Sequence, residues 1–162
     1  MLTRIFASLC LTLLLAPSAM AEGTNIAFGG PKADTTLPVE INADALSISQ
    51  ADGMAVFSGN VMVTQGVMKL SANEMRVQYA ADKKGIEKLF ASGKVLLVNA
   101  TDAAEAEQAV YTIASGQVEM SGNVLLTQGQ ATMAAQKLVI DLKTGTGRLD
   151  GRVTTTFVPG KN

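Results

Sequence analysis

The sequence predicts an all-β protein, in which bent strands fold into two facing sheets around an apolar interior. Two observations support this class. One pattern recurs four times along the chain, and apolar residues alternate with polar ones at a period of two. The pattern is plainest in residues 58–66 and 121–129, which both begin with Ser-Gly-Asn-Val, and weaker copies begin at Ser92 and Asp150. A repeat of this length indicates stacked supersecondary units that share one core.

The N-terminal residues predict an export signal. Residues 1–4 form a short basic start, residues 5–16 are apolar, and Ala19-Met20-Ala21 resembles a cleavage site with small residues. We therefore expect a signal peptide over residues 1–21, cleaved after Ala21, and localisation in the periplasm. No later apolar stretch approaches the roughly 20 residues that a membrane-spanning helix needs.

Composition excludes several classes of function. The chain has no histidine, and its single cysteine, Cys10, lies in the expected signal peptide, where the preceding Leu9 argues against a lipoprotein signal. The usual catalytic triads and transition-metal sites therefore lack their residues, and we expect no enzymatic activity, no metal and no cofactor. A formal net charge of −1 gives no electrostatic footprint for nucleic acid.

The remainder of the chain divides into three parts. Residues 22–38 carry glycine and proline among small polar residues, and we expect a flexible leader there. A single β domain follows over residues 39–158, and residues 159–162 form a short tail. In chain order the expected strands are 39–48, 54–65, 67–79, 86–99, 102–113, 117–128, 131–142 and 147–158.

These strands alternate between two types, centred on an alanine (residues 43, 72, 106 and 135) or on a glycine (residues 59, 93, 122 and 151). After each glycine the inward positions are mostly apolar, as in Val61 and Val63, so one face is buried. In the alanine strands the inward parity changes, as between Leu70 and Met75, which one extra residue in a β-bulge would cause. Eight bent strands, or about 16 short ones, would then fold along a common crease.

The chain resembles the OstA-like family of periplasmic lipopolysaccharide-transport proteins over about residues 36–158. The resemblance is most specific in residues 38–41, 56–66, 69–73 and 152–159, above all in Gly59-Asn60-Val61-Met62-Val63-Thr64-Gln65-Gly66. It implies a twisted, V-shaped antiparallel β-jellyroll whose apolar groove receives the acyl chains of lipopolysaccharide. It also implies head-to-tail self-association into a bridge between an LptC-like inner-membrane anchor and an LptD-like outer-membrane translocon.

With this resemblance, the inward apolar residues become candidates for a lipid-binding groove. Flexible methionines and branched aliphatics would suit mobile acyl chains. The alternative is that these residues form an ordinary dry core, in which case the protein is a structural β-repeat scaffold of the periplasm. The candidates are Val39, Ile41, Phe57, Val61, Val63, Leu70, Met75, Val77, Val95, Leu97, Val124, Leu126, Leu138 and Ile140.

The two terminal strands predict the surfaces for self-association. A sheet that does not close leaves unpaired backbone groups at both ends, and another copy can add a strand there. The alternative is an ordinary pair of protected edges. The edge candidates are Val39, Ile41, Leu46, Val153, Thr155 and Phe157.

Charged residues give weaker signals. Lys83, Lys84 and Lys88 cluster near a turn and could contact lipid phosphates, although such a cluster is usually a solvated turn. Glu105 and Glu107 share a strand face, but the corresponding positions of the other copies are merely polar, so we expect no acid–base catalysis.

Overall fold

The structure is a computed structural model, and it describes residues 23–30, 32–49, 53–82 and 84–158; the expected signal peptide and tail lie outside this part. The fold is all-β, and the described residues contain strands but no helix. The strands are β1 (Thr24–Ala27), β2 (Glu40–Asn42), β3 (Ala45–Ile48), β4 (Ala55–Gln65), β5 (Met68–Tyr79), β6 (Ile86–Asn99), β7 (Asp102–Thr112), β8 (Gln117–Gln128), β9 (Ala131–Asp141), β10 (Thr146–Asp150) and β11 (Thr154–Phe157).

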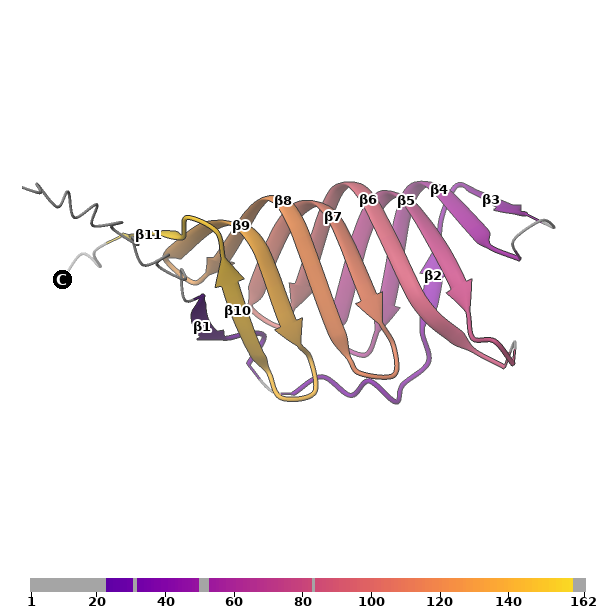
Figure 1. Cartoon of the computed structure of the whole chain (residues 1–162), viewed down its shortest axis with the longest axis horizontal. Coiled ribbons are helices and arrows are strands. Elements are labelled where there is room, and N and C mark those ends of the chain that lie inside the picture. The colour runs from indigo at the N-terminus through magenta and orange to yellow at the C-terminus, as the bar shows by residue number, and fades with distance from the viewer. Residues whose placement is uncertain (1–22, 31, 50–52, 83, 159–162) are drawn as a thin grey trace, which may run out of the picture.

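All these strands belong to one antiparallel sheet, in the order β1-β10-β9-β8-β7-β6-β5-β4-β2, with β3 also paired to β4 and β11 to β9 (Figure 1). The predicted first and last bent strands correspond to β2 with β3 and to β10 with β11. Strands β4 to β9 continue through the crease, because their backbone pairing resumes after it. The predicted all-β fold of bent antiparallel strands around an apolar interior is confirmed; in the described residues the strands number eleven and join in one sheet, whose two halves face each other across the core.

The crease is a row of bulges in the glycine strands. In β4, Ser58 pairs with Glu74 and Val61 pairs with Ala72, so two residues of β4 lie opposite one residue of β5. The two residues of β4 in this bulge are Gly59 and Asn60, and both have a left-handed backbone, with φ of 75° and 45°. Burial confirms the prediction that the inward-facing positions of the alanine strands change parity at the crease. The prediction that the extra residue of each bulge lies in the alanine strands is wrong, because the pairing places it in the glycine strands.

Asparagine follows the glycine for a local reason. It tolerates the left-handed conformation better than most residues, and its amide reaches a carboxylate of the adjacent alanine-centred segment. The Asn60 Nδ2 donates to Asp44 Oδ2 at 2.7 Å, and the Asn123 Nδ2 donates to Glu107 Oε1 at 2.5 Å. Glu107 thus has a structural role at the crease.

The N-terminal segment departs most from expectation. Strand β1 pairs with β10, from Thr24 opposite Leu149 to Ala27 opposite Thr146. The absence of a side chain at Gly147 leaves room for Ile26, since a Cβ there would lie 3.1 Å from Ile26 Cγ1. The next residue, Phe28, is only 1% exposed and belongs to the core. The expectation of a flexible leader is therefore wrong for residues 24–28, which contribute a strand and a buried ring.

Candidate functional site

The candidate site is the apolar interior between the two halves of the bent sheet. All fourteen predicted groove residues lie in or against one hydrophobic cluster. Val39, Ile41 and Phe57 are half-buried at its margin. The other eleven are at most 1% exposed: Val61, Val63, Leu70, Met75, Val77, Val95, Leu97, Val124, Leu126, Leu138 and Ile140. Their role in lipid binding stays a prediction, because the interior is closed in this structure.

Polar groups mark one rim of this interior. Among the described residues, the buried polar or charged side chains are Gln65, Asn99 and Asp102. Gln65 ends β4 and Asn99 ends β6, while Gln128 at the end of β8 is half-buried. Each of these three amides is the sixth residue after the glycine of its repeat. The repeat therefore places an amide side chain at the same point of three successive glycine strands.

The side chains of Gln65 and Asp102 at this rim hold the segment that follows β1, which we call the strap (residues 28–30 and 32–37). The Gln65 Nε2 donates to the carbonyl oxygens of Thr35 at 3.0 Å and Leu37 at 2.8 Å. The Gly29 N–H donates to Asp102 Oδ2 at 2.8 Å. The Gln128 Nε2 donates to the same carboxylate oxygen at 2.6 Å and to the carbonyl oxygen of Ala27, just before the strap, at 2.8 Å.

The opposite rim contacts the strap through backbone groups. The Phe28 N–H donates to the Gly145 carbonyl oxygen at 2.9 Å, and the Ala33 N–H donates to that of Leu142 at 3.0 Å. Both acceptors lie between β9 and β10. The strap therefore spans the mouth of the interior, and Figure 1 shows it running along the lower, hairpin side of the sheet from β1 to β2. Sequence reasoning missed this role, although the recurring amide and the lone aromatic Phe28 were available signals.

Tyr111 joins the two halves of the sheet beneath the strap. Its hydroxyl donates to Gln65 Oε1 at 2.5 Å, and its side chain is fully buried. Burial disfavours the phenolate and raises the pKa of Tyr111 to about 12. Gln65 therefore accepts a hydrogen bond from the Tyr111 hydroxyl in the interior and donates hydrogen bonds to backbone carbonyl groups of the strap.

We expect the substitution Tyr111→Phe to lower the free energy of unfolding by about 1–2 kcal/mol, because a buried amide oxygen loses its donor.

The raised pKa of Tyr111 also has a consequence at high pH. Above about pH 10 the unfolded chain releases the phenolic proton before the folded chain does, so stability is lost between about pH 10 and 12. Urea unfolding across this range should show that loss in the wild type and a smaller one in Tyr111→Phe. Equal alkaline losses in both proteins would contradict the assignment, and Tyr79→Phe, at an exposed position, is the control.

The sheet edges carry the second set of predicted residues. At the N-terminal end, β2 contains Ile41 and β3 contains Leu46; at the C-terminal end, β11 contains Thr155 and Phe157. Val39 and Val153 lie just before β2 and β11 and are half-buried. All residues of β3 and β11 are exposed, with Phe157 73% exposed. The C-terminal end of the sheet has two edges, one in each half of the bent sheet. In the half that does not contain β11, β1 pairs with β10 and covers its edge.

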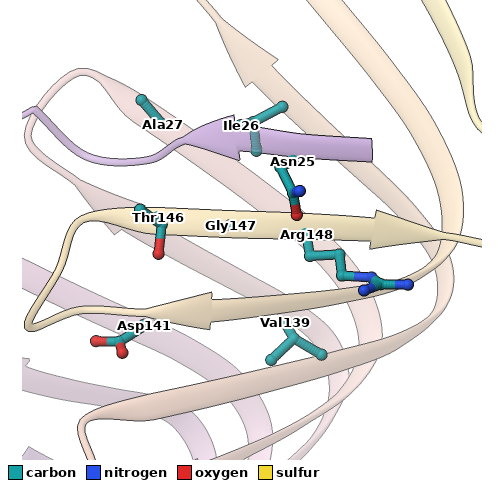
Figure 2. A pocket seen from close by; sticks show the side chains of 8 residues that line it. All are labelled: Asn25, Ile26, Ala27, Val139, Asp141, Thr146, Gly147 and Arg148. Atoms are coloured by element: carbon teal, nitrogen blue, oxygen red, sulfur yellow. The ribbon is translucent and has the colours of Figure 1, made fainter. Parts of the chain in front are cut away.

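A surface pocket of about 630 Å³ lies where β1, β10 and β9 run side by side (Figure 2). It includes none of the predicted groove residues. Its lining residues are Asn25, Ile26, Ala27, Val139, Asp141, Thr146, Gly147 and Arg148. The pocket is lined in part by β1, through Asn25, Ile26 and Ala27.

The remaining candidates stay outside the interior. Lys84 is exposed and Lys88 half-buried near the β5–β6 hairpin, whereas Lys83 lies outside the described residues. In the part of the chain that the structure describes, no acidic or sulfur-bearing cluster suits a metal ion. No helix there is long and apolar enough to cross a membrane.

The fold and the interior together define a class: bent antiparallel β modules that enclose an apolar interior and keep strand edges at both ends. Residues 40–146 match the family described as "LptA/(LptD N-terminal domain) LPS transport protein". Because this match covers more than half of the chain, the protein belongs to that family.

Individual relatives agree with this assignment. The chain is 29% identical over 166 residues to the lipopolysaccharide export system protein LptA of Escherichia coli K12, covering 94% of this chain and 87% of that one. It is 27% identical over 150 residues to LptH of Pseudomonas aeruginosa, covering 86% and 84%. An uncharacterized Rhizobium meliloti protein, R00383, is 29% identical over 157 residues, covering 90% and 84%. The crystal structure of P. aeruginosa LptH shares the fold, with a TM-score of 0.69 at 21% identity over 78% of this chain and 99% of that one.

Proposed function

We propose that this protein carries lipopolysaccharide through the periplasm and holds its acyl chains in the apolar interior, acting by binding and not by catalysis. Besides family membership, one observation supports the proposal: a single apolar cluster extends across the repeats from β4 to β10. Four buried methionines contribute to it (Met68, Met75, Met120 and Met133), and their flexible side chains suit mobile chains.

The magnitude of the interaction is compatible with transport. Burying one methylene contributes about 0.8 kcal/mol, so ten methylenes of an acyl chain would contribute roughly 8 kcal/mol before losses. Release and directed movement must then come from other components. We propose that these are an LptC-like anchor at the inner membrane and an LptD-like translocon at the outer membrane.

We further propose that copies stack head-to-tail by strand addition. The repeat supplies the register, because every glycine strand pairs with the following alanine strand at the same offset. Val124 lies opposite Ala135, and Leu126 lies opposite Met133. Extending this offset past β11 places Thr155 of one copy opposite Ile41 of the next, and Phe157 opposite Val39.

The lipid-carrying proposal is tested with a photo-crosslinking amino acid at adjacent positions of opposite orientation. Val61 is buried in the interior, whereas its neighbour Met62 is exposed on the outer face; Leu126 and Leu125 form a second such pair. During active transport in cells we expect crosslinks to lipopolysaccharide from positions 61 and 126. The same probe at positions 62 and 125 should give little or none.

Complete burial of eleven groove candidates favours a second function, a structural β scaffold with a dry interior. The same experiment separates the two. Absence of lipid crosslinks at positions 61 and 126, in variants that fold and support export, would contradict the lipid carrier and leave the scaffold.

A further inference from the structure

We propose that the strap is a lid on the apolar interior, and that the Phe28 side chain occupies the place that an acyl chain takes when the lid opens. This inference rests on the proposed lipid-carrying function and concerns how the lipid enters. It follows from the position of the strap, from the way it is held, and from the one large apolar side chain that it buries.

The position of the strap closes the interior. Its contacts alternate between the rims: Gln65 and Asp102 hold it on one side, and the carbonyl groups of Leu142 and Gly145 hold it on the other. With the strap in this place, the groove residues beneath it are at most 1% exposed. A ligand that reaches them through the mouth must therefore displace the strap.

The strap is held more weakly than the strands around it. Strands β5 and β6 are paired through ten residue pairs, whereas two backbone hydrogen bonds, from Phe28 and Ala33, join the described strap to the opposite rim. The other hydrogen bonds between the described strap residues and the sheet involve the side chains of Gln65 and Asp102, and Phe28 and Ala33 also pack against the core. The described strap residues are otherwise mostly small or polar, so lifting the strap exposes little apolar surface beyond Phe28.

Phe28 is the exception within the strap. Its ring is 1% exposed and belongs to the same cluster as the groove residues. Protein interiors are close-packed, so a ring in this cluster and an acyl chain cannot occupy the same volume. An entering chain replaces one apolar group with another, and the apolar surface of the groove stays covered during the exchange.

The strap also lies against polar side chains of the rim. The amide of Asn99 is 1% exposed beside Gly29, and its Oδ1 has no hydrogen-bond partner among the described residues. Opening would free the Nε2 group of Gln65, which can then donate to oxygen atoms at the polar end of a lipid.

Hydrogen–deuterium exchange of the wild-type protein tests the lid directly. The amides of Phe28, Gly29 and Ala33 are hydrogen-bonded in the closed state. Adding purified lipopolysaccharide should make them exchange at least severalfold faster, while amides of β5 to β8 keep their protection. A bound lipid with unchanged or slower exchange in the strap would overturn the lid and leave the carrier function intact.

A substitution gives an independent readout. We expect Phe28→Ala to bind the fluorescent fatty acid cis-parinaric acid about tenfold more tightly than the wild type. The apparent affinity is low when few molecules are open, and removing the ring should raise the fraction that can accept a ligand. The control is Phe90→Ala, since Phe90 lies half-buried between the inward residues Leu89 and Ala91 of β6 and faces outward. Equal affinities in Phe28→Ala and wild type would contradict the place-holding role. If neither protein binds parinaric acid or lipopolysaccharide, the carrier function itself fails.

Discussion

Replacing Leu126 by alanine is expected to lower the free energy of unfolding by about 2–5 kcal/mol, the usual cost of deleting a buried leucine side chain. Leu126 is fully buried in β8 and lies opposite two other interior residues, Ala104 on β7 and Met133 on β9. The surrounding strands are paired on both sides, so they cannot collapse fully onto the cavity. Urea unfolding followed by far-ultraviolet circular dichroism measures the change.

The neighbouring residue supplies a matched control. Leu125 has the same side chain on the same strand but is 38% exposed on the outer face. We expect Leu125→Ala to cost less than about 1 kcal/mol, as is usual for exposed positions. Equal losses in the two variants would contradict the assignment of inner and outer faces. An enhanced affinity for parinaric acid in Leu126→Ala would additionally support an adaptable interior.

A pair of cysteines at the two ends of the sheet is expected to produce a covalent ladder of protein copies. In the proposed head-to-tail stacking, the offset shared by the repeats would bring Thr155 of one copy opposite Ile41 of the next, and directly opposed strand residues lie within disulfide distance. Oxidation of the Ile41→Cys/Thr155→Cys variant should therefore link successive copies. Non-reducing electrophoresis should show dimers, trimers and longer species that disappear on reduction.

Two controls distinguish head-to-tail stacking from other contacts. Each single variant has one partner of the predicted pair, so it should form no ladder. Moving one cysteine by a residue, in Asn42→Cys/Thr155→Cys, places it on the other face of β2 and should abolish most linkage. A ladder from the shifted pair, or dimers alone from the predicted pair, would contradict the proposed register. Light scattering of the wild type over a range of concentrations gives the reversible counterpart.

Much of the fold could be predicted because its signal is local and repeated. Alternation at a period of two identifies the inner face, and the burial of residues such as Val61, Leu97 and Ile140 confirms it. The glycine centres mark the crease, since few other residues accept a left-handed backbone. The position of the extra residue was assigned to the wrong strand type, because a change of parity in one strand is equally produced by a bulge in its partner.

The sequence alone therefore determined the all-β class, the eight bent strands and the residues of the apolar interior. Only the tertiary structure decided whether that interior is open or closed, and what covers the edge of β10. Both answers depend on residues 24–37, which have little periodicity and are rich in small and polar side chains. Their conformation comes from long-range contacts, such as Thr24 opposite Leu149 and Gln65 bound to Leu37, and such contacts leave no pattern in a short stretch of sequence.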